Sequence, residues 1–560
     1  MRRRTSDRDL SRRQFLTGAA ATGFAIAAGC SSDESGAPST TTPTTPTTPE
    51  TTGPGSAMPV TTTSVAPGTS IGDTTTTNPP VDLPGNPFTL GVASGDPDGG
   101  NVILWTRLAP DPADPQRAGM PDEPVDVEWQ VALDEDFTDI VTAGRNTTDA
   151  ASAHSVHVDV GGLAAGVDYF YRFTVGEFTS PVGRTRVFPR VDAPLARLKI
   201  AVVNCQMREF AQYGAYRDVA EQQPELVVHL GDYIYEFSFE QALPGRRPLP
   251  HHPLVTLVDF RQRFASYKSD PDLQAAHQVA PFVCMWDDHE VANNYSGDAL
   301  PDPSRRPRQV RALRAAAYRA YWEHLPLRLA PPDGPDMTLF RSFTFGDLAT
   351  LHLLDERQYA DVPPCRTPDD FDDFGDCDEV DEPREYLGRT QQAWLHETAG
   401  LSAATWNLIG NPTVVAGVNG GTADAPAYYL DTWDGYPQAR RRFLEVLDSD
   451  RMPNPIVLTG DYHAGMVADV HEEPGDPSTS VVCTELMAPA ISSVTFGLDP
   501  AVNPHVRHAV VRNGYLLAEI TRDAVEAQFR IVEDPADRKS RVETESTWRV
   551  TAGDKRARRV

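Results

Sequence analysis

Apolar and polar residues alternate along four short stretches in the first third of the chain. These are "NVILWTRL" (101–108), "VDVEWQVAL" (125–133), "HSVHVDV" (154–160) and "VDYFYRFTV" (167–175), each rich in β-branched and aromatic residues. Alternation with a period of two indicates strands with one buried face, and the glycine, proline and aspartate residues between the stretches indicate turns. The pattern predicts an antiparallel β-sandwich over residues 85–192.

The pattern changes after residue 193. Apolar runs such as "LVVHLGD" (226–232) are continuous, and helical stretches such as "VRALRAAAYRAYWEHL" (310–325) separate them. Continuous runs are typical of strands that are buried on both faces. We therefore predict an α/β domain over residues 193–545, preceded by an all-β domain of the fibronectin or immunoglobulin type and followed by a basic tail at 546–560.

Six predicted strands of the α/β region end on polar residues. Besides "LVVHLGD", they are "LKIAVVNC" (198–205), "PFVCMWDDHE" (281–290), "LATLHLLDER" (348–357), "TWNLIGNP" (405–412) and "PIVLTGDYH" (455–463). Ligands of open α/β sheets bind outside the carboxyl ends of the strands. A single polar strand end would mean little, but six of them predict a site at this edge.

The residue types at these strand ends favour metal chemistry. Asp232 ends one strand and Tyr235 follows three residues later, so that a carboxylate able to bridge two cations lies near a phenol suited to ferric iron. The other ends supply a thiol, carboxylates, amides and an imidazole, and such mixed donor sets suit transition metals whereas oxygen donors suit calcium. Two metals close together clamp a phosphoryl group and activate water or hydroxide. The pattern predicts a metallophosphoesterase.

A family resemblance supports this interpretation. "GDYIY" matches the G-D-x-x-Y motif of purple acid phosphatases, "DDHE" stands where calcineurin-like enzymes have G-N-H-[DE], and "GDYH" where they have G-H-x-H. With "GVASGDP" (91–97), "NCQ" and "LDERQY" in order along the chain, the sequence resembles the alkaline phosphatase D family. The resemblance implies a calcineurin-like β-sandwich flanked by helices, and a phosphoesterase that hydrolyses phosphate mono- or diesters with a metal-activated hydroxide.

The resemblance also implies the cofactors and their ligands. Fe³⁺ would be held by Cys205, Asp232, Tyr235 and His463, and Asp232 would bridge to Ca²⁺. Asp288 and Asp461 would bind Ca²⁺ at positions where relatives have Asn and His, an exchange of nitrogen for oxygen that favours calcium. Asn294, with Asp287 and Asn293, would complete the calcium shell or bind a second calcium ion.

Two further residues would act on the substrate. By the resemblance, His289 would stand beside the leaving-group oxygen as a proton donor or electrostatic stabiliser. Arg357 would hold the non-bridging phosphate oxygens through its guanidinium fork. One departure concerns Asn411 and Pro412, which stand where relatives carry a glutamine pair, so that a polar contact from this loop is in doubt.

Other interpretations remain open from the sequence. Cys205 could be a buried apolar thiol, Tyr235 a packing residue, His289 a capping or core histidine, Arg357 a structural ion pair and Asp461 a turn residue. The chain could also be a purple-acid-type phosphatase with an iron–zinc or iron–manganese pair, although aspartate at 461 argues against it. A non-catalytic, calcium-binding envelope protein is the third alternative, and the presence of His289 and Arg357 argues against it.

The N-terminus has the features of an export signal. Residues 1–30 combine a basic start, the twin arginine Arg12–Arg13 and a weakly apolar stretch that ends "AAGC". They resemble a Tat signal with a lipobox, which implies the Tat machinery as a partner and a lipid anchor at Cys30. Residues 31–84, rich in threonine and proline, read as a tether. We expect a protein on the outer face of the cytoplasmic membrane, or a secreted one.

Composition limits the partners. The chain has 79 acidic and 50 basic residues, a formal charge of −29, so we expect no nucleic-acid surface, because such surfaces need clustered lysine and arginine. The expected partner is a phosphate-ester substrate, and we expect a monomer. Cys365 and Cys377 flank an acidic loop, and export favours a disulfide between them, while Cys284 and Cys483 lie in apolar runs as buried thiols.

Overall fold

The computed structural model describes residues 83–301, 304, 306–365 and 377–560. The expectations for the signal at residues 1–30, for Cys30 and for the tether up to residue 82 lie outside the described residues. Among the helices that are described, none combines the length and the apolarity that crossing a bilayer requires.

The six apolar runs of the α/β region form the centres of two sheets, as predicted. The first sheet contains the parallel strands β9 (Arg197–Val203), β10 (Leu226–Leu230) and β11 (Phe282–Met285). The second contains the parallel strands β13 (Ala349–Leu353), β14 (Trp406–Gly410) and β15 (Pro455–Thr459). Parallel neighbours end at the same edge of a sheet. Each sheet therefore brings the polar residues that follow its three strands close together.

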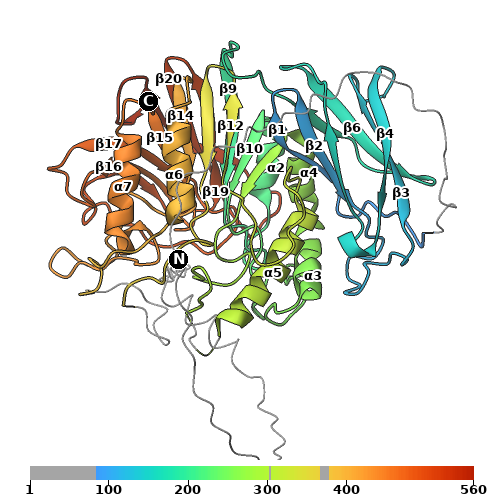
Figure 1. The fold of residues 1–560 in the computed structure, drawn as a ribbon, viewed down its shortest axis with the longest axis horizontal. Coiled ribbons are helices and arrows are strands. Elements are labelled where there is room, and N and C mark those ends of the chain that lie inside the picture. The colour runs from blue at the N-terminus through green and yellow to red at the C-terminus, as the bar shows by residue number, and fades with distance from the viewer. Residues whose placement is uncertain (1–82, 302–303, 305, 366–376) are drawn as a thin grey trace, which may run out of the picture. The chain divides into compact units, whose positions relative to one another are not determined.

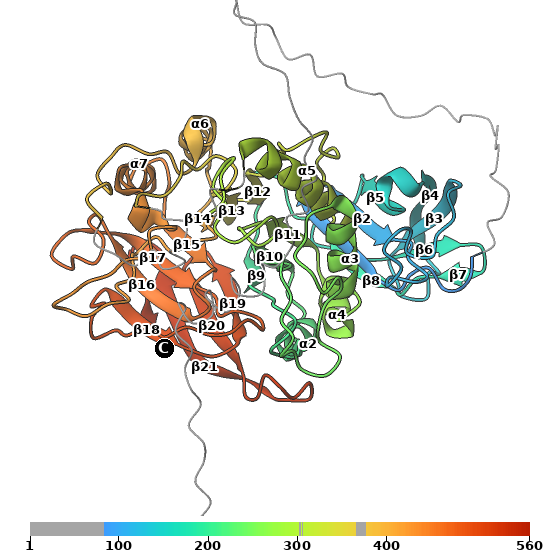
Figure 2. The same cartoon turned by 90° about the horizontal axis from the view of Figure 1, so that it is seen from below.

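The two sheets pack face to face, and helices cover their outer faces (Figures 1 and 2). One apolar core joins β9 and β10 to β13, β14 and β15, and it also includes residues of the helices on the first sheet. A second core packs α6 and α7 against the second sheet. The helices are α2 (Gly214–Gln222), α3 (Leu257–Lys268), α4 (Pro271–Val279), α5 (Pro307–His324), α6 (Gly388–Ala399) and α7 (Pro437–Leu447). Helix α5 confirms the stretch predicted at 310–325.

The N-terminal strands form two layers around a common core. One layer has the strands β3 (Val125–Ala132), β4 (Ile140–Thr148), β6 (Asp168–Val175), β7 (Phe178–Thr179) and β8 (Gly183–Arg186), and the other has β1 (Val92–Asp98), β2 (Asn101–Arg107) and β5 (Ser155–Val160). A short 3₁₀ helix, η1 (Ala150–Ser152), precedes β5. Four of these strands, β2, β3, β5 and β6, were predicted, whereas β1, β4, β7 and β8 were not. Strand β4 was missed because most of its residues are exposed or half-buried.

The second of these layers is not confined to the N-terminal domain, which was predicted to end at residue 192. Strand β1 pairs in parallel with β11, at Gly95 and Phe282, so that β1, β2 and β5 extend the first sheet of the α/β region. Figure 1 shows β1 and β2, in blue, beside the green strands of that sheet. The separation into a sandwich and a catalytic domain is therefore incomplete, because one sheet runs through both.

The C-terminal strands complete both sheets. They are β19 (Gly514–Thr521), β20 (Ala524–Val532), β21 (Val542–Thr551) and β22 (Arg558–Arg559) in the first sheet, and β16 (Gly465–His471), β17 (Val481–Met487) and β18 (Val506–Val510) in the second. The other edge of the second sheet is β12 (Arg341–Phe345), which comes before β13 in the chain. The prediction of a tail at 546–560 is wrong. Residues 546–551 continue β21, where Trp548 and Val550 are buried in the core, and β22 pairs with that strand.

The cysteines agree with the sequence analysis. Cys365 and Cys377 form a disulfide, as predicted. Cys284 and Cys483 are buried free thiols, as predicted, and so is Cys205.

The burial of Trp105 in the continuous sheet leads to a prediction for the free energy of unfolding. Trp105 of β2 is fully buried, and its Nε1 donates to the backbone oxygen of Glu323 of α5 at 3.1 Å. Removing a buried tryptophan side chain costs about 3–5 kcal/mol, so we expect Trp105→Ala to lower the free energy of unfolding by that amount. Urea unfolding followed by circular dichroism measures it.

Trp129 of β3 is the matched control. It lies in the N-terminal layer that does not join the first sheet, is half-buried, and donates through Nε1 to Asn146 at 3.0 Å. We expect Trp129→Ala to cost less than half as much. If both substitutions lower the free energy of unfolding equally, the contact of β2 with α5 stabilises the protein no more than the half-buried Trp129 does.

Candidate metal centre

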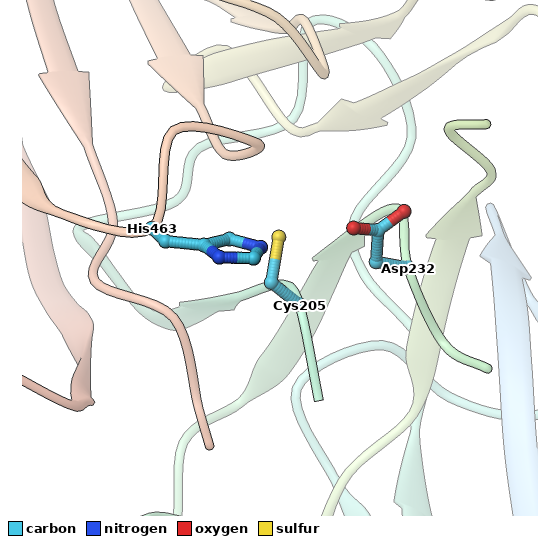
Figure 3. A group of neighbouring side chains, drawn as sticks. All are labelled: Cys205, Asp232 and His463. Carbon is cyan, nitrogen blue, oxygen red and sulfur yellow. The ribbon is translucent and has the colours of Figure 1, made fainter. Parts of the chain in front are cut away.

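The first group of candidate ligands comes from the ends of strands in both sheets. Cys205 follows β9, Asp232 follows β10 and His463 follows β15, and each offers a ligand atom within 4.8 Å of the other two. Figure 3 shows the thiol of Cys205 between the imidazole of His463 and the carboxylate of Asp232. All three are buried. The predicted convergence of these residues is therefore found in the structure.

The phenol of Tyr235 completes this first group. Its hydroxyl donates to Oδ2 of Asp232 at 2.9 Å and lies 3.1 Å from Nε2 of His463 and 2.8 Å from Oγ of Ser493. Tyr235 is fully buried. A thiol, a carboxylate, an imidazole and a phenol are thus within reach of a common point, as the sequence predicted.

The second group shares Asp232 with the first. Asp232, Asp288 and His289 offer ligand atoms within 4.8 Å of one another, and all three are buried. Asp288 and His289 follow β11, which is the neighbour of β10 in the sheet. Because one carboxylate belongs to both groups, it is suited to bridge two cations.

His289 is oriented by a hydrogen bond to Glu236, a residue to which the sequence analysis assigned no role. Its Nδ1 donates to Oε2 of Glu236 at 2.7 Å, and Oε1 of Glu236 accepts the backbone N–H of Asn293, also at 2.7 Å. The ring also packs on Tyr235, with centroids 4.2 Å apart. Glu236 therefore fixes the orientation of the imidazole and leaves its Nε2 for the site.

Several candidate ligands have strained backbone conformations. A positive φ in the left-handed region is uncommon for residues other than glycine, and such strain concentrates at functional sites. The residues concerned here, with φ between 50° and 59°, are Cys205, Asp232, Asn294, Asp461 and His463. The folded chain thus holds these five side chains on a backbone conformation that residues other than glycine adopt infrequently.

A glycine precedes the shared carboxylate for a steric reason. Gly231 has φ +94°, and a Cβ at this position would lie 2.4 Å from Cβ of Asp287 and 2.7 Å from its backbone nitrogen. No side chain fits there. The loops after β10 and β11 can therefore approach closely only with glycine at 231, which brings Asp232 and Asp288 together.

Burial and mutual repulsion set the ionisation of these groups. Burial raises the pKa of the Asp232 carboxyl well above its usual range, and Asp288 adds to this while His289 opposes it. Burial and the nearby Asp232 likewise raise the pKa of the Cys205 thiol. For His289, burial disfavours the charged form, but Asp288, Glu236 and Asp232 outweigh it and raise the pKa well above its usual range.

The donor set fits bound cations. The buried carboxylates of Asp232, Asp287, Asp288 and Asp461 gather with a thiol around one site. Anions at this density are stable in the interior only when cations pair with them, and a metal displaces the protons that burial otherwise retains. The first group offers soft and phenolic donors, and the second offers two carboxylates and the imidazole of His289.

Arg357 is buried and lies between two carboxylates. Its Nε donates to Oδ1 of Asp287 at 2.5 Å, and its Nη1 pairs with Asp431. Burial lowers the pKa of this guanidinium, but Asp287 and Asp431 outweigh it and raise the pKa well above its usual range. The ion pair considered in the sequence analysis is therefore present, and Nη2 has no hydrogen-bond partner among the described residues.

The remaining candidates lie at the margin of the two groups. Asp461 is buried after β15 and adds to the raised pKa values of Cys205 and Asp232, but it belongs to neither 4.8 Å group. The backbone N–H of Asn294 donates to Oδ2 of Asp288 at 2.6 Å. Asn411 is buried and bonds within its own segment, to Thr413 and Trp433.

Sequence reasoning missed three contacts in the site. Glu236 stands directly after Tyr235 in "GDYIYE", so its proximity to the motif was a usable signal. Tyr429 donates to Oδ1 of Asn294 at 2.9 Å, and Asp431 pairs with Arg357. Both come from the connection between β14 and α7, where no pattern marks them.

Two facing sheets between helices, with a carboxylate shared by two ligand groups at the strand ends, define a metallophosphoesterase-like fold. Purple acid phosphatase PPD1 from yellow lupin (Lupinus luteus) seeds has a similar fold, with a TM-score of 0.54 at 8% identity over 84% of this chain and 75% of that one. At this identity the likeness concerns the fold alone.

The chain belongs to the PhoD-like phosphatase family, whose members are phosphoesterase hydrolases. The family model matches residues 200–529, and the model of the PhoD-like phosphatase N-terminal domain matches residues 75–189. Alkaline phosphatase D of Bacillus subtilis (strain 168) is 39% identical over 462 residues, which cover 80% of this chain and 78% of that protein. A solved PhoD structure superposes with a TM-score of 0.80 at 37% identity, over 86% of this chain and 93% of that one. The resemblance noted from the motifs is confirmed.

Proposed function

We propose that this protein is an exported, metal-dependent phosphoesterase that hydrolyses phosphate mono- or diesters. The observation that carries the proposal is the carboxylate of Asp232, which belongs to both ligand groups. We assign Fe³⁺ to Cys205, Asp232, Tyr235 and His463, and Ca²⁺ to Asp232, Asp288 and Asp461 with Asn294. When bound, such a pair of ions clamps the phosphoryl group and activates the attacking water.

The protein's own residues would bind and orient the ester. The Nη2 atom of Arg357 is buried and makes no hydrogen bond to the described residues, so its N–H groups would remain to hold a non-bridging phosphate oxygen. His289, held through Nδ1 by Glu236, would present Nε2 to the leaving-group oxygen and donate a proton to it.

The proposed location follows from the sequence of residues 1–84. The twin-arginine signal would export the folded protein through the Tat machinery, Cys30 would carry a lipid, and the threonine- and proline-rich residues would act as a tether on the outer face of the membrane. Fractionation of cells that express the protein with Cys30→Ala tests the anchor, which predicts a shift from the membrane to the medium.

We also propose that the N-terminal strands form a fibronectin- or immunoglobulin-like sandwich with a structural role. Tyr169 supports this type of sandwich, because its hydroxyl accepts the backbone N–H of Ala164 at 2.9 Å, as a tyrosine corner does. None of the candidate ligands comes from residues 85–192.

Metal content tests the proposed function. We expect near-stoichiometric iron and calcium in the purified protein, and a visible charge-transfer band from thiolate and phenolate bound to ferric iron. Removal of calcium by a chelator should abolish hydrolysis of a chromogenic phosphate ester, and calcium should restore it. Elemental analysis and absorption spectroscopy, with both a monoester and a diester as substrates, measure these outcomes.

The contrary results are distinct. Zinc or manganese beside iron, with an acidic pH optimum, would identify a purple-acid-type phosphatase instead. A colourless, iron-free protein with full activity would remove the assignment of Cys205 and Tyr235. Bound calcium without any hydrolysis of either ester would indicate a non-catalytic calcium-binding protein.

A further inference from the structure

Residues 429–433, called the clasp segment below, contact three residues on two loops of the site. Tyr429 donates to the side chain of Asn294 at 2.9 Å, Asp431 pairs with Arg357, and Nε1 of Trp433 donates to Oε1 of Glu356 at 2.8 Å. The segment lies between β14 and α7, far along the chain from the residues it holds. It therefore joins the loops after β11 and β13 at the site.

The contact with Arg357 is the one with a consequence for substrate binding. Two nitrogens of the guanidinium are taken by carboxylates, Nε by Asp287 and Nη1 by Asp431. All three side chains are at most 2% exposed. Since a guanidinium is planar, fixing Nε and Nη1 also fixes the direction of Nη2, the nitrogen with no hydrogen-bond partner among the described residues.

Asp431 is itself held firmly. Its backbone oxygen accepts the hydroxyl of Tyr386 at 3.1 Å, and the same hydroxyl lies 2.9 Å from Oγ1 of Thr413. Thr413 in turn donates through its backbone N–H and its hydroxyl to Glu356, both at 2.8 Å. The residue before Arg357 and the residue that pairs with Arg357 are thus anchored to one network.

We propose that Asp431 is a positioning residue for the substrate, which aims Nη2 of Arg357 at a non-bridging phosphate oxygen. The inference rests on the proposed function, in which Arg357 holds the phosphate. Without the Asp431 carboxylate, Nη1 would be buried without its partner, and the guanidinium would turn to satisfy it. Small displacements of a binding group lower rates strongly, because the interaction with the reacting group depends on alignment.

Two effects of removing Asp431 have opposite signs, and this makes the proposal testable. Loss of alignment weakens the binding of phosphate. Loss of a negative charge beside Arg357 strengthens it, because the anion is then repelled less. If Asp431 acts by positioning, the first effect exceeds the second and phosphate binds more weakly.

The experiment compares Asp431→Asn with the wild-type enzyme on inorganic phosphate and a chromogenic phosphate ester. We expect the Kd of phosphate, measured by calorimetry, and its inhibition constant to rise about 10- to 100-fold. KM should rise with them, kcat should change less, and the iron and calcium content should stay the same. Asp431→Glu keeps the charge but displaces it, so it should weaken phosphate binding as well.

A double-mutant cycle tests whether Asp431 acts through Arg357. In an Arg357→Met background, Asp431→Asn should change the Kd of phosphate by less than about twofold, because the group that it positions is gone. Tyr386→Phe is the matched control: it removes one hydrogen bond to the backbone of Asp431 but keeps the ion pair with Arg357, so it should lower thermal stability and change the Kd of phosphate much less than Asp431→Asn does.

Several outcomes overturn the inference. If the Asp431→Asn variant binds phosphate as tightly as the wild type, or more tightly, the loss of the negative charge outweighs the loss of alignment. Three other results would assign Asp431 a general structural role. The increases in the Kd of phosphate could be additive in the double mutant, the Asp431→Asn variant could lose its metals, or Tyr386→Phe could raise the Kd as much as Asp431→Asn does. A wild-type protein that neither hydrolyses esters nor binds phosphate would instead end the proposed function, and the inference with it.

Discussion

Replacing Asp232 with alanine should remove both metals and nearly all activity. The carboxylate is the member shared by the two ligand groups, so its loss leaves Cys205 and His463 on one side, and Asp288 and His289 on the other, without their common ligand. A metal pair contributes several kcal/mol to the transition state, and each 1.36 kcal/mol is a factor of ten. We expect kcat/KM to fall by more than about 10⁴-fold, with iron and calcium both absent from elemental analysis.

Asp288→Ala is the matched control, because Asp288 belongs to only one of the groups. This variant should lose calcium but retain iron, and with it the visible absorption band. Both proteins should remain folded by circular dichroism, since neither Asp232 nor Asp288 belongs to the two apolar cores. Stoichiometric amounts of both metals in Asp232→Ala would exclude a bridging role for this carboxylate.

The strands of the α/β region could be predicted because their pattern is local. The run 226–230, for example, is buried at every position and forms β10 as predicted. The continuity of the first sheet could not be predicted in this way. It depends on the pairing of Gly95 with Phe282, and nothing in the alternation around either residue specifies so distant a partner. The end of the chain was misread for another reason: the basic residues at 555–559 suggested a tail, although buried and exposed residues alternate along the later part of β21.

The convergence of the site could be predicted because strand ends meet at sheet edges. Cys205, Asp232 and His463 lie together for this reason, and their backbone strain agrees with a functional role. The residues that support them could not be found in the same way. Asp431 is 74 residues from Arg357 in a connection without periodicity, and Tyr429 reaches Asn294 from the same connection. The metals and the role of each ligand stay predictions.

The second large effect concerns His289. We expect His289→Ala to lower kcat by roughly 10²–10⁴-fold, the range for a lost proton donor, while iron and calcium remain bound. The physical reason is that Glu236 holds Nδ1, which leaves Nε2 as the nitrogen able to donate to the leaving group. Steady-state kinetics together with elemental analysis of the same preparation measures both parts of the expectation.

The leaving group separates a proton donor from a metal ligand. His289 lies within the second ligand group, so the geometry by itself allows either role. A donor matters most when the leaving oxygen is basic, so the loss in His289→Ala should be larger for an alkyl ester than for a nitrophenyl ester. Glu236→Gln keeps the imidazole but removes its charged partner, and should show the same dependence in weaker form. If His289→Ala instead loses calcium and slows both esters equally, the imidazole is a ligand, and the proton must reach the leaving group from another residue or from water.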